Sequence, residues 1–230
     1  RTPWWVAAFA ALFAIAVGKQ LFGGLGHNLF NPALVGRAFV AISWAGVLAS
    51  APERGWFRTL ETVTAEGLDA ISGATRLAVA AADRAAGGAY GFDLAAQYQP
   101  LLWRNLEGSL GEISAALLIV GGVVLIAKGI IDWRIPAGYI GTMGIVALLF
   151  GSDPVFHVLA GGVMLGAFYM ATDYVSSPMS KTGRLVYGIG CGLFNGVGRF
   201  VGAMPESTTF AILFMNGLAP LVDRMTRPRT

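Results

Sequence analysis

Residues 185–204 read "LVYGIGCGLFNGVGRFVGAM", and this stretch decides the kind of fold that the chain adopts. It is mostly apolar and twenty residues long, about the length of a helix that crosses a bilayer, and six of its residues are glycine. A helix of this kind either packs closely against its neighbours or breaks beside a cavity, and close packing is the simpler interpretation. Cys191 is then a small packing residue. Asn195 and Arg199 lie four residues apart, which predicts hydrogen bonding inside a helix bundle.

The composition of the whole chain indicates that lipid is its main solvent. Of its 230 residues, 55% are hydrophobic and only 13% are charged, whereas soluble domains carry about 25% charged residues. The net charge is +3 and the basic residues are scattered, which argues against nucleic-acid binding. The single cysteine cannot form an internal disulfide, a zinc site or an iron–sulfur cluster. We therefore expect no metal site, and any redox centre is organic or is completed by other chains.

Seven apolar stretches approach the length needed to cross a bilayer. We predict an all-α integral membrane protein, a polytopic helical bundle of about seven spans that forms one transmembrane domain over residues 1–230. The long polar region at 52–109 is predicted to be a loop outside the membrane. The predicted spans are roughly 3–22, 32–51, 110–127, 135–151, 154–172, 185–204 and 208–222.

Lysine and arginine are distributed unevenly between the connections. Because basic residues favour the cytoplasmic side of a membrane, the basic connections are predicted to lie inside and the 52–109 loop outside. The chain then begins outside at Arg1, and we expect further spans to precede it. The basic connections are those around 128–134 and 173–184 and the tail, whereas the opposite connections hold Asp153 and Glu206 with no lysine or arginine.

The 52–109 loop contains "DAISGAT" at residues 69–75. These are ordinary loop residues, and a turn is the simplest interpretation. The pattern Asp-x-x-Ser-Gly-Ala-Thr, however, resembles the acceptor motif of flavin transferases, which attach FMN through its phosphate to the final threonine. Thr75 would supply the hydroxyl for this phosphoester. Gly73 and Ala74 add no bulk that would hinder a modifying enzyme.

Other residues in and beside the motif have roles that the resemblance implies. Asp69 and Ser72 belong to the fixed pattern, and Asp69 is a candidate for recognition by the transferase. Arg76 follows directly and can pair with the phosphate dianion. The linkage would leave the isoalloxazine ring free for electron transfer.

Motifs along nearly the whole chain resemble one family, the D subunits of Rnf electron transport complexes. The B subunits of the sodium-pumping NADH:quinone reductase are close relatives. "IDWRIP" (131–136) and the terminal "TRPR" (226–229) favour the Rnf members. Members of the family are longer at the N-terminus. The other matching segments are "GGLGHNLFNPALVGRAF" (23–39), "GSLGE" (108–112), "DPVFHVLAGGVMLGAFYMATD" (153–173), "SSPMSKTGR" (176–184) and "PESTTFAILFMNGLAPLVDRMTRPR" (205–229).

This resemblance implies a urea-transporter-like fold of inverted helix repeats. It also implies a flavin-carrying membrane subunit of a redox-driven ion translocase in the bacterial inner membrane. FMN on Thr75 would exchange single electrons with flavin-bearing and iron–sulfur partner subunits, and the electron flow would drive Na⁺ or H⁺ movement. A flavin transferase would be needed for maturation. Relatives also hold a riboflavin that is not covalently bound.

A second flavin or quinone pocket is expected on the cytoplasmic side. Polar side chains on a broken helix at membrane depth suit such a pocket, and the candidates are Asn28, Asn31, Asp173 and Ser176. Capping of the helix that begins at Pro32 is the simpler explanation for the two asparagines. Ordinary turn and capping roles account equally well for the other two residues.

Alternative functions stay open. The chain could be the B subunit of the quinone reductase, a solute channel or transporter without a redox role, or a structural anchor without a cofactor. A pure transporter leaves "DAISGAT" unexplained, whereas an anchor requires only that the loop be polar. His157 follows Asp153 by four residues, so both face one side of a helix. They suit an ion relay, although a packed histidine is the simpler interpretation.

Overall fold

The computed structural model describes residues 3–45, 47, 77, 80–82, 98–103, 114–202 and 207–227. Every regular element in these ranges is helical, which confirms the predicted all-α class for the described part of the chain. In chain order the elements are α1 (Trp4–Ala16), the short 3-10 helix η1 (Gln20–Phe22), α2 (Pro32–Ser43), α5 (Tyr98–Trp103), α6 (Ala115–Ala127), α7 (Arg134–Leu149), α8 (Pro154–Leu159), α9 (Val163–Leu165), the π-helix η5 (Gly166–Met170), α10 (Lys181–Phe200) and α11 (Thr208–Thr226).

Side-chain caps fix where several of these helices begin. The Asn31 side-chain oxygen accepts hydrogen bonds from the backbone N–H groups of Ala33 (3.1 Å) and Leu34 (3.4 Å). Pro32 occupies the first turn of α2, where its missing N–H group costs nothing. The capping role predicted for Asn31 is therefore confirmed. Side-chain caps also begin α6, α8 and α10, where the capping residues are Ser114, Asp153 and Ser180.

Residues 185–200 of the glycine-rich stretch lie in α10, which is one unbroken helix, and Gly188, Gly192 and Gly196 lie against α7. A Cβ added at Gly188 would lie 2.5 Å from the carbonyl oxygen of Ile135, and one at Gly192 would lie 2.5 Å from that of Tyr139. Both oxygens belong to the α7 backbone, which cannot move aside as a side chain can. A Cβ at Gly138 of α7 would in turn lie 3.0 Å from a carbonyl oxygen of α10. The two backbones are in direct contact, which confirms close packing.

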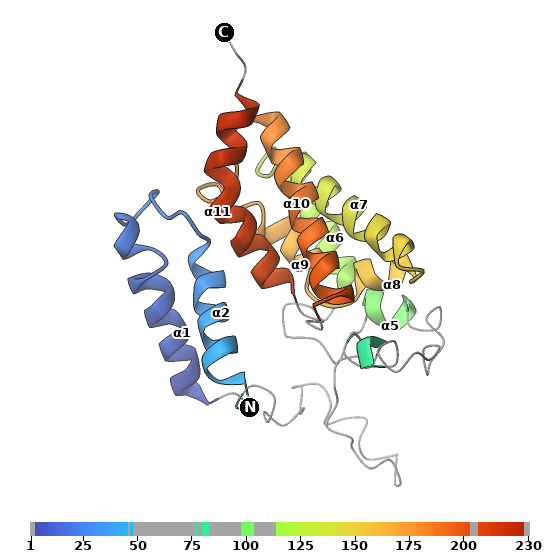
Figure 1. The fold of residues 1–230 in the computed structure, drawn as a ribbon, viewed down its shortest axis with the longest axis horizontal. Coiled ribbons are helices and arrows are strands. Elements are labelled where there is room, and N and C mark those ends of the chain that lie inside the picture. The colour runs from blue at the N-terminus through green and yellow to red at the C-terminus, as the bar shows by residue number, and fades with distance from the viewer. Residues whose placement is uncertain are drawn as a thin grey trace.

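The helices run in alternating directions between two ends of the bundle (Figure 1). The helices α1, α6, α8 with α9, and α11 run toward the end where the C-terminus lies, and α2, α7 and α10 run back. At this C-terminal end, the Asp223 carboxylate accepts hydrogen bonds from the N–H groups of Met179 and Ser180. At the opposite end, the Tyr98 hydroxyl donates to Asp153. These hydrogen bonds hold the helix ends together at both ends of the bundle.

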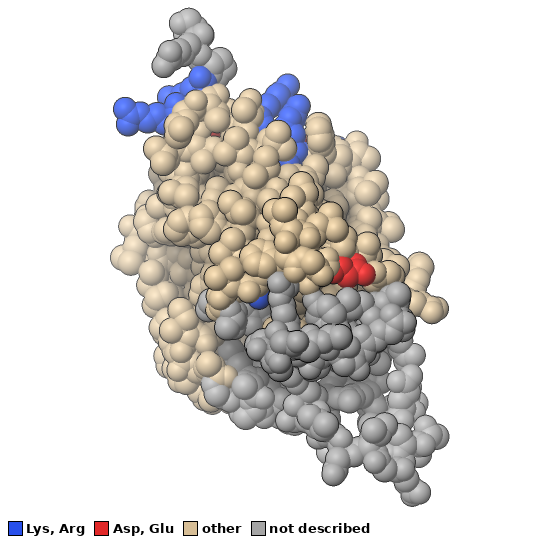
Figure 2. All heavy atoms as spheres, turned by 45° about the vertical axis from the view of Figure 1, so that its right-hand side comes forward, with Lys and Arg blue, Asp and Glu red and all other residues tan. Residues whose placement is uncertain are grey.

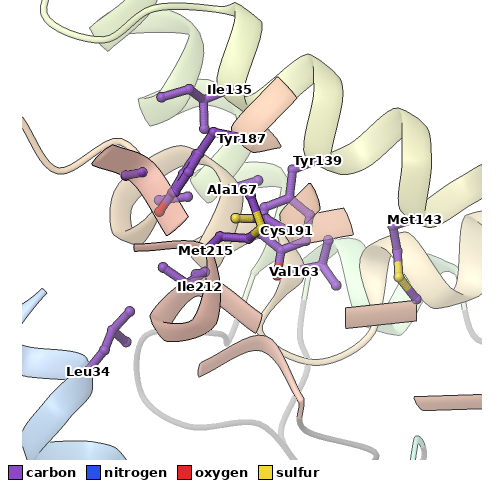
Figure 3. Close-up of a cluster of buried hydrophobic side chains, with 12 residues drawn as sticks. Leu34, Ile135, Tyr139, Met143, Val163, Ala167, Tyr187, Cys191, Ile212 and Met215 are labelled. Atoms are coloured by element: carbon purple, nitrogen blue, oxygen red, sulfur yellow. The ribbon is translucent and has the colours of Figure 1, made fainter. Parts of the chain in front are cut away.

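The core lies where α7, α10, α11 and the α9–η5 segment meet (Figure 3). Tyr139, Met143, Tyr187, Cys191 and Ile212 are all fully buried there. Cys191 is therefore a small buried packing residue, as the sequence predicts.

The helices α1 and α2 pack against each other as a pair. A Cβ added at Gly36 would lie 2.3 Å from the carbonyl oxygen of Ala10, so these two backbones also touch. The rings of Phe13 and Phe39 stack with their centroids 3.9 Å apart. Contacts between α2 and α11 join the pair to the rest of the bundle.

Among the described residues, one helical segment is long and apolar enough to cross a membrane by length and composition, Trp4–Phe22 with 19 residues. The helices α2, α6 and α7 are apolar but shorter. Residues 154–172, predicted to form one span, are instead divided into α8, α9 and η5, with a break at 160–162. The physical reason is local: Ala160 is extended, and Gly161 has a φ of +68°, which glycine adopts at little cost.

Gly192→Leu is expected to destabilise the fold because the α7 backbone occupies the space that the new side chain needs. Overpacking of this kind costs about 1–3 kcal/mol, and the measurement is the thermal unfolding temperature in detergent. Gly141→Leu on α7 is the matched control, since a Cβ there meets no atom within 4 Å. Equal unfolding temperatures for the two variants would contradict the backbone contact.

Candidate functional site

The chain that follows the predicted flavin acceptor is anchored on the bundle. Leu77 and Ala80 are 4% and 1% exposed, and residues 80–82 are helical. The two side chains pack with Leu101 of α5 and Phe156 of α8. The predicted acceptor residues themselves lie outside the described residues; they are Asp69, Ser72, Gly73, Ala74, Thr75 and Arg76.

Asp153 joins α5 to α8 beside this anchored segment. One carboxylate oxygen accepts from the N–H groups of Val155 (2.8 Å) and Phe156 (3.1 Å), and the other accepts from the Tyr98 hydroxyl. Burial raises the pKa of Asp153, but the Tyr98 hydroxyl, the two backbone donors and the charge of His157 together hold that pKa below its ordinary value. Asp153 is therefore an ionised cap and clamp at neutral pH.

His157 is buried between α8 and α10. Its ring packs edge-on against Phe156 and Phe200, with centroids 5.3 and 4.7 Å away. These ring contacts fit the simpler of the two interpretations, a histidine packed into the bundle.

A buried arginine meets the break between α8 and α9. Arg199, 6% exposed, donates from Nη1 to the carbonyl oxygen of His157 (2.7 Å) and from Nη2 to that of Ala160 (3.1 Å). Both carbonyls lie at the C-terminal end of α8, where helical hydrogen bonding stops. Gly161 leaves room for the guanidinium, since a Cβ there would lie 2.9 Å from Nη2. The interior hydrogen bonding predicted for Arg199 is confirmed, with a broken helix as its partner.

Arg199 ends a row of buried side chains that recurs every four residues along one face of α10 and begins at Tyr187. Within this row, Asn195 Nδ2 donates to the hydroxyl groups of Tyr139 (3.0 Å) and Thr208 (3.3 Å). The interior hydrogen bonding predicted for Asn195 is thus confirmed as well. The row places polar groups in the interior of the bundle, beside the glycine contact with α7.

The other end of the row reaches α11. The Tyr187 hydroxyl donates to Oδ1 of Asn216, which is fully buried. Nδ2 of Asn216 has no hydrogen-bond partner among the described residues. Buried donors of this kind are normally satisfied by an ordered water or by an acceptor on a ligand.

The four residues predicted for a second pocket are brought together only in part. Asn31 Nδ2 donates to the carbonyl oxygen of Met170 (3.3 Å), which joins the start of α2 to the end of η5. The Ser176 hydroxyl donates to the Asp173 carboxylate (2.8 Å). Asn28 is buried and donates to a carbonyl of its own loop. Within the described part of the chain, no hydrogen bond links Asn28 to Asp173 or Ser176.

Asp132 holds two arginines at the C-terminal end of the bundle. Its carboxylate lies 3.1 Å from Nη1 of Arg134 and 3.0 Å from Nη1 of Arg184, which links the start of α7 to the start of α10. Burial raises the pKa of Asp132, but the backbone N–H of Arg134 and the two guanidinium groups hold that pKa below its ordinary value.

Sequence reasoning missed several residues of these clusters. The pairs Asp132–Arg184 and Tyr187–Asn216 join polar residues that lie far apart in the chain, so the spacing within each pair carries no signal. The break in the 154–172 stretch does carry one, because Gly161 and Gly162 are adjacent inside an apolar run.

These features define, over the described residues, an all-helical bundle with a polar interior and a helix broken within it. The chain matches the NQR2, RnfD, RnfE family over residues 1–230 and belongs to it. The resemblance seen in the sequence motifs is thereby confirmed.

Relatives named as D subunits match nearly the whole chain. The D subunit of the "Na(+)-translocating ferredoxin:NAD(+) oxidoreductase complex" from Acetobacterium woodii is 44% identical over 100% of this chain and 67% of its own length. The D subunit of the "Ion-translocating oxidoreductase complex" from Stutzerimonas stutzeri is 41% identical over 99% of this chain and 70% of its own length. The D subunit of the "Proton-translocating ferredoxin:NAD(+) oxidoreductase complex" from Clostridium ljungdahlii is 38% identical over 98% of this chain and 68% of its own length.

Asp132→Asn is expected to flatten the acid dependence of stability. Because the folded-state pKa of Asp132 is depressed, the ionised group stabilises the fold above its unfolded pKa of about 3.9, and this stabilisation is lost as pH falls through the folded value. At neutral pH the variant should lose about 1–3 kcal/mol. The measurement is the unfolding temperature between about pH 7 and pH 3. Parallel profiles for the variant and the wild type would show that the Asp132 pairing does not stabilise the fold.

Proposed function

We propose that this chain is the flavin-carrying membrane subunit of an ion-translocating ferredoxin:NAD⁺ oxidoreductase complex of the Rnf type. The observation that carries the proposal is the 44% identity, along the whole chain, with the D subunit from Acetobacterium woodii. Electron flow through the complex drives Na⁺ or H⁺ across the membrane. This chain supplies a cofactor scaffold and part of the ion path. Ferredoxin and NAD⁺ chemistry belongs to the flavin-bearing and iron–sulfur partner subunits, since this chain has a single cysteine and no dinucleotide fingerprint.

Several surface features support a place in the bacterial inner membrane. The outward side chains of α6 are apolar, with Leu117, Val120 and Val124 between 46% and 70% exposed. Lysine and arginine gather at the C-terminal end of the bundle (Figure 2). By the positive-inside rule, this distribution supports a cytoplasmic position for that end and an outside position for the 52–109 loop. We assign the seven proposed spans to α1, α2, α6, α7, the α8–α9–η5 segment, α10 and α11. The broken segment would suit the proposed urea-transporter-like fold.

The covalent flavin is proposed to be FMN on Thr75. One residue separates Thr75 from Leu77, which is anchored on α5 and α8, so a group attached to Thr75 is tethered at the outer end of the bundle. A tether is useful there, because a dissociating FMN would be lost outside the cell. Arg76 can pair with the phosphate. A flavin transferase would recognise the motif formed by Asp69, Ser72, Gly73, Ala74 and Thr75.

A second, non-covalent flavin or quinone is proposed at the cytoplasmic end. The hydrogen bond from Asn31 to Met170 places the start of α2 beside the segment that leads to Asp173. The amide and carboxylate groups of this region can bond the polar edge of a riboflavin or quinone ring. Asn28 and Ser176 are the two buried members of the candidate set.

Thr75→Ala is expected to abolish covalent flavin. The membrane fraction from a host that has the transferase is denatured, and in-gel fluorescence is recorded for this chain. The wild-type band should be fluorescent and the Thr75→Ala band dark, because no phosphoester can form on alanine. Thr64→Ala, a threonine of the same loop, is the matched control and should stay fluorescent.

Two dark bands, for the wild type and Thr75→Ala alike, would remove the covalent flavin from the proposal. They would favour the second candidate function, a solute channel without a redox role. The observation that favours this function is the broken helix, since broken helices form the binding sites of many transporters. Ferredoxin-dependent activity of the purified complex separates the Rnf assignment from the quinone reductase. Quinone reduction with NADH and no response to ferredoxin would favour the quinone reductase.

A further inference from the structure

The break between α8 and α9 exposes carbonyl groups inside the bundle. Helical hydrogen bonding stops at Ala160, so the last carbonyls of α8 lack the N–H partners that a continuing helix would supply. An unpaired carbonyl away from water costs several kcal/mol in a bilayer. In broken helices of transporters, such carbonyl ends are where alkali cations bind.

In this protein a side-chain cation occupies that position. The Arg199 guanidinium donates to the carbonyl oxygens of His157 (2.7 Å) and Ala160 (3.1 Å), and the residue is only 6% exposed. Arginine stays protonated in proteins, so the charge is permanent. The two carbonyls therefore receive a positive charge from α10 in place of an ion from solution.

The surroundings are shaped to seat the guanidinium. Gly161 has a φ of +68°. A Cβ added at this position would lie 2.9 Å from Nη2 of Arg199, so any larger residue would press on the guanidinium. The side chain of Leu77 closes the same point from the other side, 3.1 Å from that Cβ position. The seat is thus enclosed by the broken helix, by α10 and by the anchored segment after the 52–76 region.

We propose that the α8–α9 break is a monovalent-cation site filled by the Arg199 guanidinium, a tethered cation that closes the bundle to passive ion flow. This inference rests on the proposed function, because a barrier to ions has a meaning only in a membrane. In this proposal Arg199 prevents passive leak of ions through the bundle, in addition to holding α8 and α10 together. A purely structural bond would stabilise the fold without any effect on ion leak.

The test is passive flux through the reconstituted complex. The complex is placed in phospholipid vesicles without ferredoxin or NAD⁺, and Na⁺ and H⁺ leak are measured down an imposed gradient. Arg199→Gln should raise the leak at least tenfold over the wild type, whereas Arg199→Lys should stay tight because it keeps a cation. Arg184→Gln is the matched control, an arginine at the opposite end that also bonds a carbonyl oxygen, that of Pro178. It should not leak.

A chemical rescue identifies the site as one for a cation. In Arg199→Ala vesicles, millimolar guanidinium ion should suppress the leak, and urea, its neutral analogue of similar shape, should not. Gly161→Ala provides a milder variant, because it presses on the guanidinium without removing the charge. Its leak should lie between those of the wild type and Arg199→Gln, which keeps the test valid if Arg199 variants do not assemble.

The outcomes separate this inference from the proposed function. Fluorescent, incorporated Arg199→Gln and Gly161→Ala complexes that are as tight as the wild type would overturn the tethered cation and leave the redox subunit intact. Equal rescue by guanidinium ion and urea would overturn it as well, since a cavity and not a charge would then be filled. A dark wild-type band in the gel would count against the covalent flavin alone.

Discussion

The direct contact between the backbones of α7 and α10 is the constraint on which the rest of the bundle depends. Gly188 and Gly192 let the two backbones touch, so the position and rotation of α10 are fixed there by backbone atoms that cannot move aside. Once that face is fixed, the directions of the buried side chains from Tyr187 to Arg199 on the same helix are fixed as well. A larger residue in the glycine face would therefore displace the polar row together with the helix, and the polar contacts would be lost with the packing.

The polar row and the broken helix depend on each other. A guanidinium buried without acceptors would be costly, and so would carbonyls buried without donors. The two hydrogen bonds from Arg199 to the carbonyls of His157 and Ala160 reduce both costs in one arrangement, so they stabilise the interruption of the helix inside the bundle. Asn195 is satisfied differently, by hydroxyl groups of the neighbouring helices. Each polar group in the row thus constrains a different partner, and together they specify one packing of the bundle.

Local signals in the sequence predict local structure well here, and distant pairing poorly. The Asn31-Pro32 cap and the glycine face of α10 follow from neighbouring residues, and both are confirmed. The glycine pair at 161 and 162 carried a usable signal for the break, but the apolar character of the stretch outweighed it. The bond between Asp132 and Arg184 spans more than fifty positions and follows only from the packing of α7 on α10. The proposed acceptor motif around Thr75 is a chemical signal that needs no fold, because a transferase would recognise the residue types in their order along the chain.

The nature of the barrier bears on how such a protein can serve different ions. Relatives named for sodium and for proton translocation match this chain at 44% and 38% identity over nearly its whole length, so one fold accommodates both. No group of three or more His, Cys, Asp or Glu side chains that could hold a metal ion occurs among the described residues. The groups that meet the Arg199 charge at the α8–α9 break are backbone carbonyls. Such ligands are repositioned by small movements of a helix, and they do not titrate. Because the Arg199 charge is also independent of pH, a barrier built on it opens only when α8 and α10 move apart. Coupling by this route therefore requires a redox-driven shift of helices, and a change of protonation alone would not suffice.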